Sequence, residues 1–234
     1  MTERLGSKFS SAYGALTRIG KAGILSLALA GAAFAQEDTV TIVALGDSLT
    51  QGYGLIEAEG FVPQLEAWLE ARGHDVDVQN HGVSGDTTAG GLSRIGWALG
   101  PEADAMIVAL GGNDLLRGIP PETARANLDG ILSEAEARGL PVLLVGLQAP
   151  GNYGPDYKAA FDAMYPELAE EYDAIHVESF LGALTEAAEL DRDAAMARYM
   201  QPDGLHPSAE GVALIVEALG PRVEELIQRV SPQS

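Results

Sequence analysis

The sequence predicts an α/β protein whose parallel sheet is covered by helices on both faces. Two observations lead to this fold class. Short apolar runs with few polar residues alternate with longer amphipathic stretches along residues 36–234, and strands of that kind are typically buried on both faces. The same stretch contains no Pro/Ser/Gly-rich linker, low-complexity tract or fixed-period repeat. We therefore expect one domain over residues 36–234, a length that can bury a substantial core.

The predicted elements alternate in chain order. Short apolar or alternating runs predict five strands, at Val40–Leu45, Asp75–Gln79, Ala105–Leu110, Val142–Leu147 and Ala174–Val177. Apolar residues at helical spacing predict helices at Phe61–Arg72, Glu122–Arg138, Tyr157–Tyr172 and Ala209–Val230. Parallel sheets place their active sites beyond the carboxyl ends of the strands. Functional residues are therefore expected directly after the strands.

A secretory signal peptide is predicted at residues 1–35. Four basic residues precede an apolar run at residues 22–35, which ends in the A-x-A pattern Ala33-Phe34-Ala35. These features are the basic region, the short apolar region and the cleavage site of such a signal. The run is too short to span a bilayer comfortably; a buried core helix or an uncleaved anchor is the alternative interpretation. We expect cleavage after Ala35, export to the periplasm or medium of a bacterium, and no membrane span afterwards.

Charge and composition exclude several classes of function. The chain has 34 acidic and 14 basic residues, a net charge of −20. Such a surface repels phosphate backbones and anionic membranes, so no nucleic-acid partner is expected. The chain has no cysteine, which excludes disulfides, thiolate catalysis and cysteine-based metal sites.

The first predicted strand runs into residues 46–49 (GDSL). A serine here would lie in a strand-to-helix turn, with its hydroxyl facing the cleft and its N–H among the unpaired donors of a helix start. Such donors favour a developing negative charge. An ordinary helix start is the alternative, because Asp47 and Ser48 are both good N-cap residues. The tetrapeptide alone does not decide between these interpretations.

Two further blocks follow the second and third predicted strands. Residues 80–87 (NHGVSGDT) contain two glycines, which let the backbone turn tightly and approach a ligand closely. The alternative is a plain turn into a helix capped by Asp86 or Thr87. Residues 111–114 (GGND) expose backbone and side-chain donors, and Asn113 can offer an N–H to an oxyanion. Either block alone would be an unremarkable turn.

Histidine is the expected general base, and residues 36–234 contain His74, His81, His176 and His206. Asp203 stands three residues before His206, so its carboxylate can orient the imidazole through Nδ1–H and leave Nε2 free to take a hydroxyl proton. The same segment can also be a capping turn before the last helix. His74 follows a helix-ending turn, His176 falls inside a short strand, and His81 has no acid three residues before it. His206 is therefore the best candidate.

Together these four blocks resemble the GDSL/SGNH hydrolase family. Ser48 matches its nucleophile, Gly85 its backbone oxyanion donor, Asn113 its side-chain donor, and Asp203 with His206 its acid–base pair. The blocks occur in the family's order and cover nearly all of residues 40–234. The closest likeness is to the branch that contains bacterial thioesterase I and the periplasmic arylesterases. It rests on residues 84–87 (SGDT), 112–118 (GNDLLRG) and 152–154 (NYG).

The resemblance implies a three-layer, flavodoxin-like fold with a five-stranded parallel sheet and no G-x-S-x-G elbow, a motif that this sequence lacks. It also implies hydrolysis of carboxylic esters or thioesters through an acyl-serine, as in arylesterases, acyl thioesterases and lysophospholipases, with neither metal nor cofactor. The oxyanion would meet the N–H groups of Ser48 and Gly85 and the amide of Asn113. One chain would hold the whole site, so a monomer acting on a small acyl ester or thioester is expected.

A loop after the fourth strand is the predicted substrate-binding segment. Residues 148–154 (QAPGNYG) are similar in character to a loop that shapes substrate preference in this branch. Its candidate contacts are Gln148, Pro150, Asn152 and Tyr153. His81 departs from the family pattern, because relatives often have a small residue there, and its imidazole is in a position to crowd or tune the oxyanion region.

Three alternatives remain open. A carbohydrate O-deacetylase of the same superfamily is the second reading, but sugar clefts need exposed aromatic platforms. Aromatic residues are only 6% of the chain. Trp68 falls in the predicted helix Phe61–Arg72, and Trp97 in the helix expected after Asp86 or Thr87. A non-catalytic binding protein would be expected to have lost a catalytic residue, and none is missing. Ser84 could replace Ser48 as the nucleophile, which a Ser84→Ala variant would test.

Overall fold

Side chains alternate between two apolar faces along the central strand β1 (Val40–Gly46). The computed structural model describes residues 39–230. Ile42 and Ala44 belong to one core cluster, and Val43 and Leu45 to the other, because successive side chains of a strand point to opposite faces. A strand that is apolar on both faces must be covered on both, and this requirement produces the three layers of the domain.

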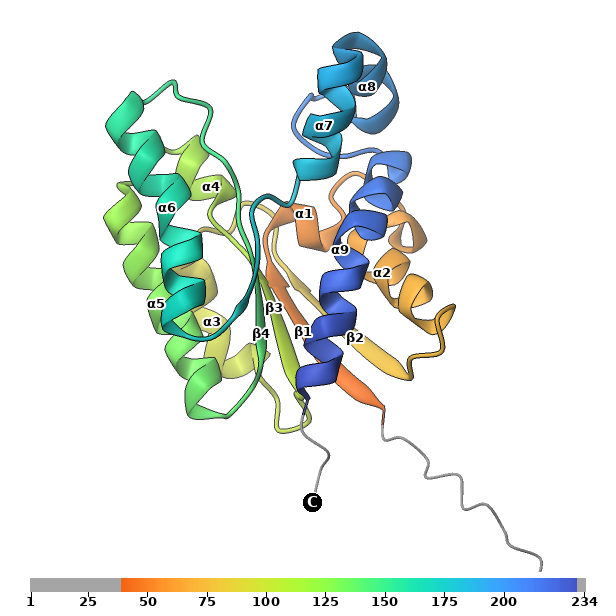
Figure 1. Cartoon of the computed structure of the whole chain (residues 1–234), viewed down its shortest axis with the longest axis vertical. Helices are drawn as coiled ribbons and strands as arrows, with labels where there is room; N and C mark the ends of the chain where they lie inside the picture. The colour runs from red at the N-terminus through yellow and green to blue at the C-terminus, as the bar shows by residue number, and fades with distance from the viewer. Residues whose placement is uncertain (1–38, 231–234) are drawn as a thin grey trace, which may run out of the picture. The chain divides into compact units, whose positions relative to one another are not determined.

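Five helices provide most of that cover (Figure 1). Helices α2 (Phe61–Glu70) and α9 (Ala209–Arg229) pack on one face of the sheet. Helices α3 (Thr88–Ala98), α5 (Pro121–Ala137) and α6 (Pro155–Glu171) pack on the other. The predicted three-layer α/β class is confirmed.

The sheet has five parallel strands in the order β2-β1-β3-β4-β5. The other strands are β2 (Val76–Gly82), β3 (Ala105–Ala109), β4 (Val142–Val145) and β5 (Ile175–Val177). This is the flavodoxin-like order. From β1 the chain first adds β2 on one side and then crosses to add β3, β4 and β5 on the other, so that the switch point lies between β1 and β3. A crevice therefore opens beyond the carboxyl ends of these two strands.

Several elements differ from the sequence-based expectation. Strand β2 continues through His81 and Gly82 because these residues pair with Leu45 and Gly46 of β1, a long-range contact that local polarity does not reveal. Short helices that sequence periodicity does not predict follow or lie near the strand ends. They are α1 (Ser48–Gln51), η1 (Glu57–Glu59), α4 (Gly112–Leu116), α7 (Gly182–Leu190) and α8 (Arg192–Tyr199).

Figure 1 shows α1, α4 and α7 at the carboxyl end of the sheet, where the crevice lies. The predicted signal peptide at residues 1–35 lies outside the described residues. Within residues 39–230, no helix is both long and apolar enough to cross a membrane.

Candidate active site

Three side chains from opposite ends of the chain meet at the carboxyl end of β1. His206 Nε2 lies 2.9 Å from the Oγ of Ser48, and His206 Nδ1 lies 2.7 Å from the Oδ2 of Asp203. The hydroxyl, the imidazole and the carboxylate thus form one hydrogen-bonded row. In such a row an imidazole can accept a proton from the hydroxyl while the carboxylate holds its orientation.

Asp203 is held ionised by the hydrogen bonds that it accepts. The His206 side chain has the largest effect, followed by the backbone N–H groups of His206 and Leu205, at 3.0 and 2.9 Å from Oδ1. These contacts lower the pKa of Asp203 to about 2. The carboxylate is therefore available to the Nδ1–H of His206 at any neutral pH.

Ser48 is the first residue of α1, and Asp47 caps that helix by accepting the N–H of Leu49 at 3.0 Å. The other carboxylate oxygen of Asp47 accepts from the Nδ2 of Asn113 at 3.3 Å. Burial raises the pKa of Asp47 to about 6, against the lowering effect of these two donors. The sequence offered a cap or a nucleophile here, and the structure assigns the capping contact to Asp47, which leaves the Ser48 hydroxyl to His206.

Gly85 lies on the loop after β2 with a φ of +80°, a left-handed conformation that favours glycine. Its carbonyl oxygen accepts from Arg117 at 2.7 Å. Arg117 is the C-cap residue of α4, the helix that carries Asn113. Within residues 39–230, the N–H of Gly85 and the N–H of Ser48 donate to no protein acceptor, so both are available to a ligand.

Two further contacts tie the Gly85 loop to its neighbours. Arg94 donates to Asp86 at 2.7 Å and to the carbonyl oxygen of Gly46 at 2.9 Å. The buried carboxylate of Asp114 accepts from both the N–H and the hydroxyl of Thr88, at 2.8 and 2.6 Å. The loop is therefore fastened both to β1 and to α4.

An apolar pocket of about 140 Å³ opens beside these groups. Ser48, Asn113 and His206 contribute polar atoms to its wall, and Gln148 lies at its edge. Six leucines make up most of the remainder: Leu49, Leu115, Leu116, Leu147, Leu181 and Leu205. A wall of this composition suits a hydrocarbon group next to a reactive hydroxyl.

The predicted substrate loop is only partly at this pocket. Gln148 lines it, with its Nε2 donating to Glu178 at 2.6 Å. Pro150 and Asn152 are exposed and do not line the pocket. Tyr153 lies outside the pocket, with its hydroxyl 3.5 Å from the carbonyl oxygen of Leu116.

Two other residues singled out from the sequence lie elsewhere. The N–H and hydroxyl of Ser84 both donate to the side-chain oxygen of Gln51, so a glutamine, and no histidine, is its partner. His81 does not line the pocket, and its ring lies 5.7 Å from that of Trp97. Burial, with a smaller effect of Arg94, lowers the pKa of His81.

Sequence reasoning missed Tyr53 and the leucine wall. The ring centroid of Tyr53 lies 4.6 Å from that of His206, and Gln201 donates to the Tyr53 carbonyl oxygen at 2.7 Å. Leu115 and Leu116 directly follow the GGND block, which could have suggested their place at the site; in sequence they are indistinguishable from core leucines. Among residues 39–230, no three His, Asp or Glu side chains are grouped to hold a metal ion.

The sequence model of the GDSL-like lipase/acylhydrolase family matches residues 44–214. The esterase TesA of Pseudomonas aeruginosa is 36% identical, with 80% of this chain and 89% of that protein covered. The arylesterase of Vibrio mimicus is 33% identical, with 88% and 96% covered. The Escherichia coli K12 protein named thioesterase 1/protease 1/lysophospholipase L1 is 31% identical, with 82% and 86% covered.

Solved structures agree with these relatives. AlinE4, described as an SGNH-hydrolase family esterase, is 45% identical, with a TM-score of 0.64 over 80% of this chain and 96% of that one. A crystal structure of TesA is 36% identical, with a TM-score of 0.70 over 80% and 99%. The sequence-based resemblance and the predicted flavodoxin-like SGNH fold are thus confirmed.

Proposed function

Because the chain belongs to the GDSL-like lipase/acylhydrolase family and is a serine ester hydrolase, we propose that Ser48 is its nucleophile, His206 its general base and Asp203 the group that orients His206. The observation that carries this proposal is the hydrogen-bonded row of Ser48, His206 and Asp203 at 2.9 and 2.7 Å. The substrate is a small-molecule ester. We propose both carboxylic esters and thioesters as substrates, because the relatives' names include both esterase and thioesterase.

Acylation begins at the Ser48 hydroxyl. His206 Nε2 removes the hydroxyl proton as Oγ attacks the carbonyl carbon, and the new C–O bond gives a tetrahedral intermediate. The imidazolium is stabilised by the carboxylate of Asp203. When the intermediate collapses, His206 passes its proton to the departing alkoxide or thiolate, which leaves as alcohol or thiol. Water, activated by His206, then attacks the acyl-serine by the same route and releases the acid.

Three donors are proposed for the oxyanion of that intermediate: the N–H groups of Ser48 and Gly85 and the Nδ2–H of Asn113. The two N–H groups have no protein acceptor among residues 39–230, and Asn113 lines the same pocket as Ser48. Donors fixed in advance stabilise the developing charge without having to reorganise during the reaction.

The leucine wall favours an acyl chain over a sugar as the group beside Ser48. Six leucines line the pocket, and among residues 39–230 the His206 imidazole is the one aromatic ring that does so, whereas sugars are commonly bound on aromatic platforms. An aryl or alkyl ester, a thioester or a single-chain lysophospholipid all place hydrocarbon next to the reacting carbonyl. Gln148 is proposed to contact the substrate from the pocket edge, and Pro150, Asn152 and Tyr153 from the loop beyond it.

The remaining proposals concern the state of the protein. Signal cleavage after Ala35 would release residues 36–234 as an exported, monomeric enzyme; support comes from the basic, apolar and small-residue pattern of residues 1–35 and from a site built within one chain. Peptide sequencing of the exported protein and its mass in solution test the two statements separately.

The nucleophile is tested with Ser48→Ala and a short p-nitrophenyl ester. We expect hydrolysis to fall by about 10⁶-fold, while circular dichroism and the melting temperature are unchanged. Ser84→Ala is the matched control, because that hydroxyl is held by Gln51, and it should retain near-normal rates. Near-normal rates in Ser48→Ala would contradict the assignment.

A further inference from the structure

Five exposed apolar side chains lie around the active-site pocket, and we call them the apolar rim. They are Tyr53, Ile56, Leu116, Tyr153 and Leu205, with exposed fractions between 44% and 68%. Single apolar side chains on a surface are normal, but a connected group marks an interaction site. What matters is therefore whether these five side chains are connected.

Contacts join the members of the rim to the site and to one another. Leu116 and Leu205 line the pocket while remaining about half exposed. The ring of Tyr53 packs at a tilt against that of His206, and the Tyr153 hydroxyl reaches the carbonyl oxygen of Leu116. Ile56 and Tyr53 line a neighbouring hollow on the same segment. The rim is thus continuous with the leucine wall of the pocket.

The rim is assembled from four separate segments of the chain. Tyr53 and Ile56 follow α1, Leu116 ends α4, Tyr153 follows β4, and Leu205 precedes α9. Each segment reaches the carboxyl end of the sheet, where Figure 1 shows α1 and α4. None of the five side chains contributes to the buried core, so folding gains little from their being apolar.

We propose that the apolar rim adsorbs the enzyme to an uncharged or zwitterionic lipid surface, from which single acyl chains enter the pocket. This inference rests on the proposed function, since it assigns the rim to the delivery of acyl esters to Ser48. The pocket wall is apolar on the inside and the rim is apolar on the outside, so a hydrocarbon chain can pass from the lipid phase to the site with little exposure to water. A soluble polar ester would need no such rim.

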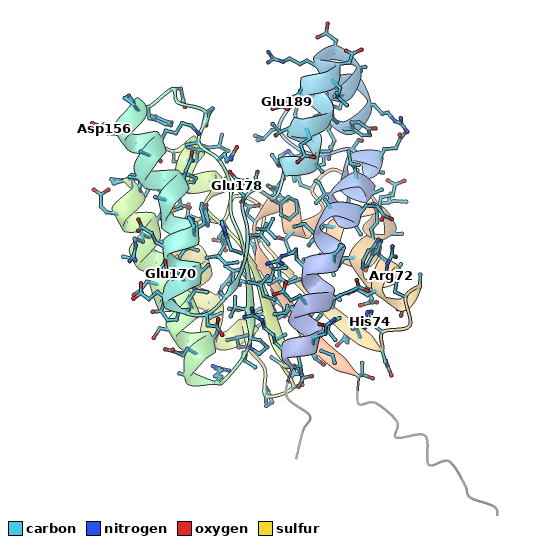
Figure 2. All side chains as sticks on the ribbon, viewed as in Figure 1. Arg72, His74, Asp156, Glu170, Glu178 and Glu189 are labelled. Carbon is cyan, nitrogen blue, oxygen red and sulfur yellow. The ribbon has the colours of Figure 1, made fainter. Side chains whose placement is uncertain are left out.

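Charge decides which lipid surface is suitable. The chain carries 34 acidic and 14 basic residues, and Figure 2 shows Asp156, Glu178 and Glu189 toward the same end of the domain as the pocket. The only lysine within residues 39–230, Lys158, is paired with Asp162. Anionic headgroups would be repelled by this end of the molecule, whereas phosphatidylcholine carries no net charge.

The test measures partition of the exported protein to vesicles, with Ser48→Ala present in every variant so that no lipid is cleaved. Phosphatidylcholine vesicles should bind the protein, and vesicles with one third phosphatidylglycerol should bind it at least threefold less at low salt. Ile56→Ser should lower binding to phosphatidylcholine at least threefold, and Ile56→Trp should raise it. Trp97→Ser removes an even more exposed apolar side chain, beside His81 and outside the rim, and should leave binding unchanged.

The outcomes separate this inference from the proposed function. With Ser48 restored, Ile56→Ser should hydrolyse a soluble short ester at the normal rate and a micellar ester more slowly. Three results would contradict adsorption through the rim and leave the Ser48 assignment standing. They are absence of vesicle binding, preference for the anionic vesicles, and binding by Ile56→Ser equal to that of the parent protein. A change in oligomeric state with Ile56→Ser, without a change in vesicle binding, would assign the rim to self-association instead. Loss of the Ser48 assignment would show in hydrolysis and not in partition.

Discussion

On one side of Ser48, buried polar contacts join distant parts of the chain; on the other, the contacts are mostly local. The first side, which we call the oxyanion side, holds the Gly85 loop and the Asn113 helix. Here Thr88 and Asp114 are buried together, and their bond links α3 to α4. Arg94 links the same loop to β1.

The second side, the base side, is the segment of Asp203 and His206. Asp203 accepts the N–H groups two and three residues later in the chain. Gln201 closes the same turn. Its N–H donates to the carbonyl oxygen of His206 and its Nε2 to that of Pro207. Its one long-range bond goes to the backbone of Tyr53.

The difference matches the two roles that we propose, oxyanion donors on one side and a general base on the other. Oxyanion donors work best when they are fixed before charge develops, and contacts between separate elements fix them. A general base must take up a proton and release it twice in each cycle. A turn closed mainly by local bonds permits this, and its bonds to distant segments are those to Ser48 and Tyr53. Substitutions on the oxyanion side should therefore change both turnover and the free energy of unfolding, and those on the base side mainly turnover.

Among the substitutions that compare the two sides, the largest effect is expected from Asp203→Asn on the base side. An amide in place of the carboxylate favours the wrong imidazole tautomer, and turnover should fall about 10⁴-fold. The melting temperature should hardly change, because the side chain is exposed and its other contacts are local. Steady-state kinetics and a thermal melt check both statements, with Asp156→Asn as an exposed control. A large loss of stability would erase the contrast between the two sides.

Asn113→Ala tests the oxyanion side. Loss of one donor should lower turnover about 10²–10³-fold with KM little changed. Asp47 also loses the hydrogen bond from Nδ2, so the free energy of unfolding should fall by about 1 kcal/mol. Urea unfolding and ester kinetics on one preparation measure the two effects, with Gln228→Ala on α9 as the exposed amide control. Unchanged turnover would remove Asn113 from the proposed oxyanion site.

The strands and long helices could be predicted from the sequence because their apolar patterns are local. The ends could not. Strand β2 gains its last residues from pairing with β1, and α4 spans only residues 112–116, too few to show helical periodicity. Such short helices depend on tertiary contacts.

The candidate site was predicted from the order of its blocks and not from distance along the chain. Ser48 and His206 are 158 residues apart, and no spacing rule connects them. The role of Asp114 could not be foreseen, since a buried carboxylate and an exposed cap look alike in sequence. The pocket leucines could not be identified either, because leucine lines the pocket and also fills the core.

Asp47 gives a pH-dependent test of the oxyanion side. Burial raises its pKa from 3.8 to about 6, so the folded state holds a proton that the unfolded chain has released. This contribution to stability is full below pH 3.8 and is lost as pH rises through about 6, by about 3 kcal/mol in total. In Asp47→Asn this step should disappear.

Urea unfolding of both proteins at pH 4.5 and 7.5 isolates the effect, because every other titrating group is common to both. The difference between the two proteins in the free energy of unfolding should therefore change with pH. An identical pH dependence would show that Asp47 is not the group that titrates.

The smallest effect is expected from Arg117→Gln, which tests whether the Gly85 loop needs its tie to α4. The guanidinium donates to the Gly85 carbonyl oxygen at 2.7 Å, which belongs to the peptide after Gly85; without this bond Gly85 can rotate and so shift the N–H on its other side. Small misplacements of a donor cost more in the transition state than in the ground state. Turnover should therefore fall about tenfold with KM unchanged.

Arg117→Lys should recover part of that loss, because an ammonium can reach the same oxygen. Arg125→Gln is the control, since Arg125 pairs with Glu167 and Glu171 between α5 and α6, away from the loop. Equal losses in Arg117→Gln and Arg125→Gln would point to a general effect of lost charge. A loss confined to Arg117 and restored by lysine would mean that the oxyanion side depends on contacts between elements, even where these contacts are exposed.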